Sequence, residues 1–401
     1  MIKNIIVVND YDYVQGGASL VAIEQANLLY DEGYNVIFFC GVSNKGKSIL
    51  NPKIQVVSTN KYDSISNPNK IVGMFQGVNN KQAYLKMKML ISSFNSNETL
   101  VSIHGYTKAL SVSFIKACKE KKIKTLLTAH DYFSICPNGG LFNYKKNEVC
   151  NKQGKFSCRF CNCDSRNYLF KLYRNFRFNQ QTKRFKFREN IDYLITISDT
   201  NEKLLKKFFI NSKIVRIYNP TSIGLKAPRV SCEKNDVYIY VGRIDKEKGI
   251  NYLCESFKKL NKKLMLIGSG TEYESLKRKY ESDKIRFIGW LKHDEVILYM
   301  KKARALIFPC LLYEGAPLTI FEAQSQGLPC IVSKFSNASD FINDNVGWIY
   351  DPYDDSLGKL ICSLNNDLIL NKSILGYKQY WDKPFNKKRY INELLKLINE
   401  M

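Results

Sequence analysis

The chain has 401 residues, 45% hydrophobic and 24% charged, a length that suits two globular domains better than one. Its 61 Lys and Arg against 37 Asp and Glu give a net charge of +24, which favours anionic partners or simply reflects a solvated basic surface. No apolar run is long enough to span a bilayer, and the apolar start lacks a signal-peptide cleavage site, so we expect a cytoplasmic protein.

The first half of the chain alternates strand and helix signals. Continuous apolar runs predict buried parallel strands at residues 4–8, 35–41, 99–105, 124–131 and 193–198. After the first run, Gly16 and Gly17 precede an amphipathic helix that ends at Gly33. Repeated β-α units of this kind predict a Rossmann-like domain with an open parallel sheet at residues 1–217.

The second half repeats the pattern. Residues 218–235 contain two prolines and little periodicity, and are predicted to be a linker. Apolar runs restart in residues 236–375 and predict a second Rossmann-like domain. The amphipathic tail, residues 376–401, is expected to form a helix that packs back on the first domain. The predicted fold class is α/β, with two parallel domains facing across a cleft where strand C-terminal ends bind ligands.

Glycines and cations follow two predicted strands of the second domain. Gly242 ends one strand and precedes Arg243 and Lys248. The planar guanidinium of Arg can donate two parallel hydrogen bonds, and the ammonium of Lys is a positive charge on a flexible side chain, so the pair suits a diphosphate. Gly268 and Gly270 end the next strand, where missing Cβ atoms let the backbone approach a ligand. Each signal alone is weak, because strand-end glycines and surface cations are common.

The stretch LYEGAPLTIFEAQSQGLP, residues 312–329, contains two glutamates around a predicted helix start. Pro317 suits a first helical turn, whose free amides attract an anion. Glu322, one turn inside the helix, can accept hydrogen bonds from two ribose hydroxyls. Glu314 would repel a bound anion unless it accepts a hydrogen bond from a hydroxyl or pairs with a cation. An ordinary capped helix explains the same residues, and the two glutamates alone favour that interpretation.

Several motifs together resemble glycosyltransferase family 4, retaining enzymes of the GT-B fold. YEGAPLTIFEAQSQGLP resembles the family's E-x7-E signature, with Glu314 and Glu322 as its glutamates, and VGRIDKEKG resembles its diphosphate-binding turn. GSG, FIGW, VQGGAS, TAHD and NVGWIYDP resemble further family motifs, in order, from residue 2 to about 355. Here Ala316-Pro317 replaces the frequent Phe-Gly pair, which removes one donor amide.

The resemblance implies roles for individual residues. The implied catalytic residues are His130, Glu314, Arg243 and Lys248, with no metal or other cofactor at the catalytic centre. The implied donor-binding residues are Gly16, Gly17, Gly242, Arg243, Lys248, Gly268, Gly270, Gly289, Trp290, Glu314, Gly315, Ala316, Pro317, Leu318, Thr319 and Glu322. A strand-end histidine with a structural hydrogen bond is the alternative for His130.

Five of the twelve cysteines fall in one short insert, at about residues 136–163. Their thiolates suit a structural zinc site, with Cys136, Cys150, Cys158 and Cys161 as ligands and Cys163 spare or substituting. An iron–sulfur cluster and a reduced, metal-free loop remain open.

Aromatic and basic residues alternate in the segment that follows, NYLFKLYRNFRFNQQTKRFKFRENIDYL. This pattern fits a helix on an anionic membrane surface, a single-stranded nucleic-acid platform, or a helix whose aromatics pack on the domain core.

We therefore expect a retaining glycosyltransferase that transfers a sugar from a UDP- or GDP-linked donor to a glycan or polyprenyl-diphosphate-linked acceptor in bacterial surface polysaccharide synthesis. It would be cytoplasmic, with possible peripheral contact with the inner face of the membrane, and would bind no nucleic acid. The alternatives are a GT-B sugar-nucleotide epimerase and a basic, zinc-bearing nucleic-acid-binding protein.

Overall fold

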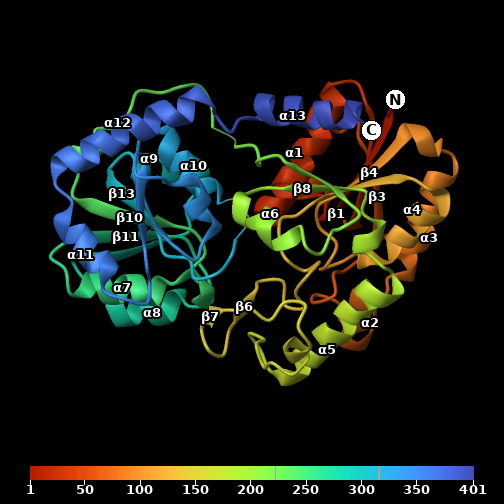
Figure 1. Cartoon of the computed structure of the whole chain (residues 1–401), viewed down its shortest axis with the longest axis horizontal. Helices are drawn as coiled ribbons and strands as arrows, with labels where there is room; N and C mark the ends of the chain where they lie inside the picture. The colour runs from red at the N-terminus through yellow and green to blue at the C-terminus, as the bar shows by residue number, and fades with distance from the viewer. Residues whose placement is uncertain (222, 315–316) are drawn as a thin grey trace. The chain divides into compact units, whose positions relative to one another are not determined.

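The computed structural model of the chain describes residues 1–221, 223–314 and 317–401. The chain forms two compact units, each assembled from separate segments. Unit 1 contains residues 1–140, 152–220 and 387–401, and unit 2 contains residues 141–151 and 221–386. Each unit is a parallel sheet with helices packed against it (Figure 1).

The sheet of unit 1 has seven parallel strands in the order β3-β2-β1-β4-β5-β8-β9. The strands are β1 (Asn4–Tyr11), β2 (Asn35–Val42), β3 (Gln55–Asn60), β4 (Thr99–Ile103), β5 (Lys124–Thr128), β8 (Tyr193–Thr196) and β9 (Lys213–Arg216). The helices are α1 (Gly17–Asp31), α2 (Lys70–Val78), α3 (Lys81–Ser92), α4 (Ile115–Lys121), α5 (Tyr168–Asn179), α6 (Asp199–Leu205) and α13 (Lys387–Asn399). The central strands are buried on both faces, which explains their continuous apolar sequences.

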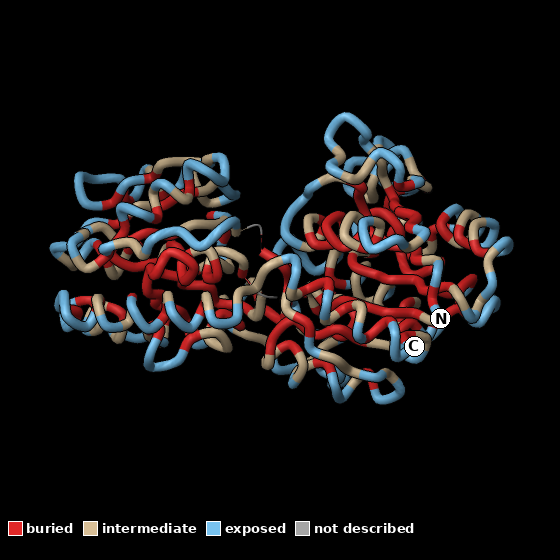
Figure 2. Tube along the Cα trace, turned by 90° about the horizontal axis from the view of Figure 1, so that it is seen from above, coloured by how far each residue is buried: buried red, intermediate tan, exposed pale blue. Residues whose placement is uncertain are grey.

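The sheet of unit 2 has six parallel strands in the order β12-β11-β10-β13-β14-β15. The strands are β10 (Val237–Val241), β11 (Lys263–Ile267), β12 (Ile285–Gly289), β13 (Ala303–Phe308), β14 (Cys330–Ser333) and β15 (Gly347–Tyr350). The helices are α7 (Ile250–Lys258), α8 (Tyr273–Tyr280), α9 (His293–Met300), α10 (Leu318–Ser325), α11 (Ser356–Ser363) and α12 (Asn366–Asp382). Figure 2 shows the buried strands of each sheet surrounded by helices with exposed outer faces.

The structure differs from the expected domain division in the C-terminal tail. Instead of one helix over residues 376–401, α12 ends at Asp382 in unit 2 and α13 belongs to unit 1, where it packs beside α1 (Figure 1). Pro384 lies between the two helices, and proline cannot continue a helix. Tyr390 of α13 accepts a hydrogen bond from Gln25 of α1, at 2.8 Å.

The insert also divides between the units. Residues 141–151, which include the short hairpin of β6 (Phe142–Asn143) and β7 (Glu148–Val149), belong to unit 2, and Phe142 is buried in that unit's core. The rest of the cysteine-rich segment belongs to unit 1. The predicted single insert within residues 1–217 therefore contributes to both units.

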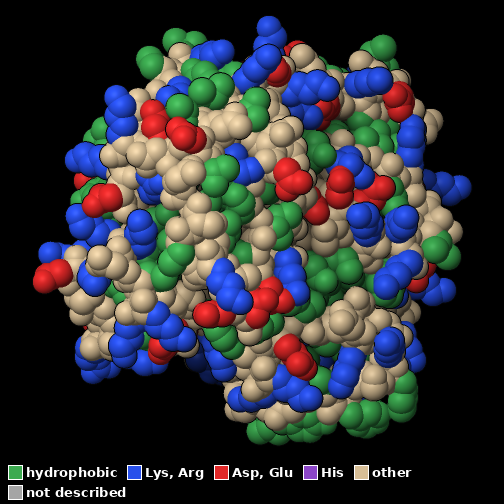
Figure 3. Space-filling view, turned by 60° about the vertical axis from the view of Figure 1, so that its left-hand side comes forward, with side chains coloured by type: hydrophobic (Ala, Val, Ile, Leu, Met, Phe, Trp, Pro, Cys, Tyr) green, Lys and Arg blue, Asp and Glu red, His purple; other side chains and the backbone are tan. Residues whose placement is uncertain are grey.

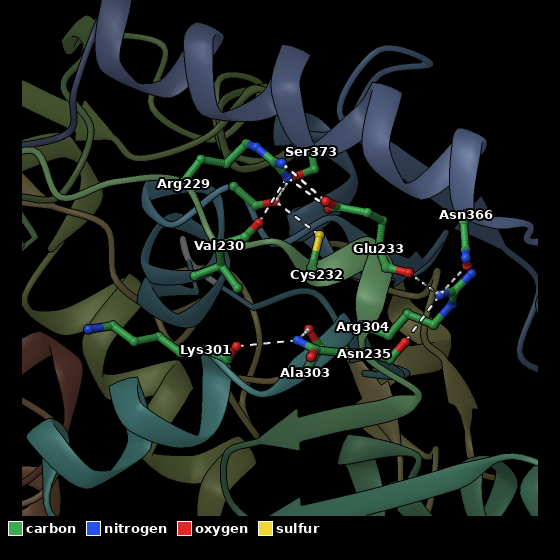
Figure 4. A network of polar contacts seen from close by, with 11 residues as sticks. Arg229, Val230, Cys232, Glu233, Asn235, Lys301, Ala303, Arg304, Asn366 and Ser373 are labelled. Atoms are coloured by element: carbon green, nitrogen blue, oxygen red, sulfur yellow. Dashed lines mark hydrogen bonds and ion pairs between the residues drawn. The ribbon is translucent and has the colours of Figure 1, made fainter.

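Residues 223–235, most of the linker expected at residues 218–235, pack as part of unit 2. Cys232 is fully buried in the core, and the Arg229 guanidinium donates to Glu233 at 3.0 Å and to Ser373 of α12 at 2.7 Å (Figure 4). The buried Arg304 guanidinium donates to the backbone oxygens of Glu233 and Asn235 at 3.0 and 3.1 Å. These hydrogen bonds fix the segment against β13 and α12, because a buried guanidinium requires partners for its donors.

Candidate functional site

The turn after β10 carries the predicted phosphate-binding cations. Gly242 adopts a φ of +154°, and the side chain of Arg243 is 68% exposed. Its guanidinium pairs with Asp245 at 2.7 Å and with Glu247 at 3.6 Å. Asp245 also accepts from the backbone and hydroxyl of Thr271, at 2.8 and 2.9 Å. The exposed guanidinium is therefore held at the carboxyl end of the sheet with donors available to an anion.

Lys248 and Glu314 come together in the same region. Their side chains are 13% and 17% exposed and form an ion pair. Burial lowers the pKa of the Lys248 ammonium, and the nearby Glu247 and Asp245 carboxylates partly oppose this by favouring the charged form. The Cys310 thiol donates to Glu314 at 3.3 Å. The structure thus provides Glu314 with the cationic partner that the sequence argument required.

The strand-end glycines meet a packing requirement within the protein itself. A Cβ on Gly268 would lie 1.8 Å from the backbone oxygen of Gly242, and one on Gly270 would lie 2.4 Å from that of Ile244. The glycines therefore let two loops of the protein pack closely, which shapes the site whether or not a ligand touches them. At the next strand end, Gly289 has a φ of +89° and Trp290 is 71% exposed.

The helix α10 begins directly after Pro317, which is its N-cap. Leu318 and Thr319 occupy the first turn, where backbone amides have no intrahelical partner. Gly315 and Ala316, also predicted to bind the donor, lie outside the described residues.

Glu322 of α10 has a histidine partner that sequence reasoning missed. His293, at the start of α9, lies with its Nε2 atom 3.1 Å from Oε1 of Glu322. This hydrogen bond raises the pKa of His293. The side chain of Glu322 is 16% exposed, so it combines partial shielding with an acceptor oxygen near the surface.

Two predicted site regions belong to unit 1. Gly16, with a φ of +129°, and Gly17 form the N-terminus of α1, and a Cβ on either would meet open space. His130 follows β5, is partly exposed, and lies with Nε2 at 2.9 Å from Nδ1 of the buried His104. His104 was also missed, although it directly follows an apolar strand in the sequence VSIHG.

The carboxyl group beside His130 is unusual. Burial raises the pKa of Asp131 to about 6, although its Oδ1 accepts from the Phe133 amide at 3.0 Å. Burial also lowers the pKa of His130 to about 4, so its ring is neutral at physiological pH. Perturbed titratable groups on adjacent residues at a strand end are typical of functional sites.

The cysteines of the insert do not all belong to one unit. Cys136, Cys158, Cys161 and Cys163 are in unit 1, and Cys150 is in unit 2. Lys171 of α5 is fully buried beside them, with its ammonium 3.8 Å from the Cys158 sulfur. As the described side chains lie, no three His, Cys, Asp or Glu residues are grouped to hold a metal ion.

An apolar and basic groove of about 790 Å³ lies beside α5 in unit 1. Phe156, Phe160 and Phe176 line it and are 69%, 65% and 52% exposed, and Lys and Arg side chains stand among them. Figure 3 shows a group of apolar side chains at the lower edge of the molecule, at the height that α5 has in Figure 1. Lys and Arg side chains lie beside this group. The described helices include none with the length and apolarity that a membrane crossing requires. Other aromatics of the segment, Phe185 and Phe187, are buried, so part of it does pack on the core.

Comparison with known proteins relates these features to a family. Residues 225–375 match the family model of glycosyl transferases group 1. An uncharacterized glycosyltransferase of Haemophilus influenzae is 24% identical and covers 79% of this chain and 76% of its own. The UDP-Gal:alpha-D-GlcNAc-diphosphoundecaprenol alpha-1,3-galactosyltransferase of Escherichia coli is 28% identical over 44% of this chain, which spans about half (49%) of that relative.

The solved structures support the fold. Anabaena Alr3699/HepE in complex with UDP and glucose superimposes with a TM-score of 0.67 at 14% identity, with both chains fully covered. The predicted GT-B fold class is therefore confirmed. The match of residues 225–375 to the glycosyl transferases group 1 model, together with the relatives, supports glycosyltransferase activity for the chain.

Proposed function

We propose that the protein is a retaining hexosyltransferase of glycosyltransferase family 4, with a nucleoside-diphosphate sugar as donor. One observation carries the proposal: Arg243, Lys248 and Glu314 meet at the carboxyl end of the unit 2 sheet. Two cations at this end of the sheet suit a diphosphate, and the unpaired amides at the N-terminus of α10 would add to them.

The proposed reaction breaks the bond between the sugar's anomeric carbon and the diphosphate oxygen. The bond to the acceptor oxygen forms on the same face of the sugar, and the acceptor proton leaves with the diphosphate. Arg243 and Lys248 neutralise the charge that develops on the departing diphosphate. Glu314 holds Lys248 and binds a sugar hydroxyl, Glu322 accepts from the ribose hydroxyls, and His130 contacts a substrate hydroxyl.

For the substrates, we propose a UDP-linked donor and a polyprenyl-diphosphate-linked acceptor in bacterial surface polysaccharide synthesis. The Anabaena structure contains UDP, and the name of the Escherichia coli relative specifies UDP-Gal and a diphosphoundecaprenol acceptor. The net charge of +24 is consistent with two phosphorylated substrates.

We further propose that the groove beside α5 contacts an anionic membrane surface. Exposed aromatics next to Lys155, Arg159 and Lys183 combine apolar insertion with attraction to acidic headgroups. Sedimentation with phosphatidylglycerol vesicles, but not with phosphatidylcholine vesicles, is expected. Phe156→Asp together with Phe160→Asp should abolish it, whereas Ile374→Asp at an exposed position of unit 2 should not. Equal sedimentation of all three proteins would contradict this contact.

A structural metal in the cysteine-rich segment is also a proposal, although the side chains as they lie do not surround an ion. Its support is chemical. A buried ammonium is costly without negative charge nearby, and thiolate ligands beside Lys171 would provide that charge. Elemental analysis should find about one zinc, or iron with sulfide, per chain. Comparison of Cys150→Ser with Cys163→Ser would identify the fourth ligand, and a metal-free wild-type chain would refute the proposal.

The main test is a thermal-shift panel of UDP, GDP, ADP, dTDP and CMP, followed by turnover assays. We expect UDP to raise the melting temperature of wild type but not of Lys248→Met. With UDP-sugars, UDP should be released only when an acceptor is added, and NMR of the product should show the donor's anomeric configuration. UDP release without acceptor, together with an epimerised sugar, would favour the epimerase instead.

A further inference from the structure

A continuous line of hydrogen bonds runs through unit 1 and ends at His130. Gln25 of α1 lies in the middle, fully buried, and its Nε2 donates to the hydroxyl of Tyr390 at 2.8 Å. Its Oε1 lies 3.0 Å from Nε2 of His104, and Nδ1 of His104 lies 2.9 Å from Nε2 of His130. The line therefore connects α13, α1 and the ends of β4 and β5.

The two imidazole rings have the geometry of a good hydrogen bond. Their centroids are 5.1 Å apart and their planes differ by 22°. With the facing nitrogens at 2.9 Å, the rings lie edge to edge in nearly one plane, so the N–H of one points along the lone pair of the other.

The direction of the line follows from Gln25. A carboxamide oxygen can only accept, and it also accepts from the Ser102 hydroxyl at 2.7 Å. Nε2 of His104 must therefore carry a proton. Because burial lowers the pKa of His104 well below its ordinary value, the ring is neutral and its Nδ1 has a lone pair. That lone pair requires a proton on Nε2 of His130.

We propose that Gln25 and His104 are positioning residues that fix His130 as its Nε2–H tautomer, so that its Nδ1 offers a lone pair to a substrate hydroxyl. No described residue forms a hydrogen bond with this Nδ1 atom, and His130 is partly exposed. The hydroxyl belongs to a sugar substrate if the proposed function holds, and only that part of the inference rests on it. A rotated Gln25 amide would reverse every bond and give His130 an Nδ1–H donor instead.

The test reads the tautomers directly. The chain has only three histidines, so long-range ¹H–¹⁵N spectra of protein labelled at histidine are readable at neutral pH and above. His293 of unit 2 serves as the internal reference. We expect the ¹⁵N shifts of both His104 and His130 to report a protonated Nε2 and an unprotonated Nδ1. A protonated Nδ1 at His130 in the wild-type protein would overturn the proposal.

Matched variants test whether Gln25 fixes the tautomers of His104 and His130. Gln25→Glu keeps a side-chain oxygen that accepts from His104, so both histidines should keep their tautomers. Gln25→Leu removes this acceptor, so His130 should exchange between its two neutral tautomers and its two ring nitrogens should show averaged ¹⁵N shifts. Ser102→Ala removes the neighbouring donor to Gln25 but leaves the line intact, so it should change neither histidine. Unchanged His130 shifts in a folded Gln25→Leu variant would refute a positioning role for Gln25.

A kinetic comparison separates this inference from the proposed function. In Gln25→Leu we expect kcat/KM for the acceptor to fall about tenfold, while the KM for the donor stays unchanged. The spectra need no substrate, so they remain decisive even if no glycosyl transfer is found. An unaltered acceptor kcat/KM alongside altered tautomers would overturn the assignment of the Nδ1 lone pair to a substrate hydroxyl.

Discussion

The Lys248 ammonium and the Glu314 carboxylate form a largely buried ion pair between the turn after β10 and the loop before α10. Removing one partner leaves the other charge without compensation, whereas neutralising both removes the problem. We expect Lys248→Met to destabilise unit 2 by about 3 kcal/mol and the double variant Lys248→Met, Glu314→Gln by clearly less. Urea denaturation measures both, and equal destabilisation would contradict a direct pair.

Catalysis should respond differently from stability. The double variant regains the folded state but lacks the cation for the departing diphosphate, so turnover should remain at least a hundredfold below wild type. A double variant with wild-type turnover would remove Lys248 from the proposed mechanism.

The two glutamates around Pro317 should affect different kinetic constants. Glu322→Ala is expected to weaken nucleotide binding by about tenfold or more, because it removes the acceptor for the ribose hydroxyls. Glu314→Ala should chiefly lower kcat. Calorimetric titration with UDP and steady-state assays distinguish the two, and wild-type behaviour of both variants would contradict the proposed donor site.

His293 should report on Glu322 without any substrate. Its raised pKa comes first from the hydrogen bond to Glu322, so Glu322→Gln should lower it towards the ordinary value near 6.5. The hydrogen bond stabilises the folded protein fully at pH values below the unfolded-state pKa of His293. This stabilisation is lost as the pH rises through the higher folded-state pKa of His293. NMR titration of His293 measures the pKa, and an identical value in both proteins would contradict the contact.

Asp131 should make stability depend on pH with the opposite sign from an ion-paired carboxylate. Its folded-state pKa of about 6 exceeds the unfolded value, so its ionised form costs stability above pH 6, and this cost disappears as pH falls towards 4. Asp131→Asn should therefore stabilise the protein at pH 7.5 by up to roughly 2–3 kcal/mol and have little effect near pH 4.

The control for this prediction is Asp283→Asn, which changes a fully exposed carboxylate. Its melting temperature should follow wild type at both pH values. If Asp131→Asn did the same, the carboxyl of Asp131 would have an ordinary pKa.

Gly268 should tolerate no side chain. Its φ of +137° and a Cβ position 1.8 Å from the Gly242 oxygen mean that Gly268→Ala must move the backbone, at a cost of about 3 kcal/mol or more. Gly224→Ala, in open space, should change stability by less than about 0.5 kcal/mol. Thermal melts compare the two variants, and similar melting temperatures would show that the two loops are not closely packed.

Most strands could be predicted from the sequence, but the two edge strands of the unit 1 sheet could not. All six strands of the unit 2 sheet appear as apolar runs, whereas β3 and β9 at the edges of the unit 1 sheet were missed. Both are only partly buried, so their sequences lack the continuous apolar run of a central strand. The helix break at Pro384 was within reach of sequence reasoning, since proline is a strong helix stop.

The candidate site was predictable only where a residue belongs to a local motif. Glu322 and His130 stand in recognisable stretches, but the histidines that contact them, His293 and His104, do not. His104 lies 26 residues from His130 and 79 from Gln25, and His293 lies 29 residues from Glu322. Single histidines and glutamines carry no signal of such distant contacts, because the folded sheet, and not the local sequence, brings them together.

The segmented make-up of unit 1 has a consequence for its synthesis. Residues 1–140 leave the ribosome first, but α13, which covers α1 and supplies Tyr390 to Gln25, is translated only after all of unit 2. Until α13 has been translated, the surface of α1 that it contacts is uncovered in the nascent unit 1, and Gln25 lacks its hydrogen bond to Tyr390. The hydrogen bond from Gln25 to Tyr390 can form only after residues 387–401 have been translated, so a stalled or shortened chain would contain both sheets but lack the α13 end of this line of hydrogen bonds.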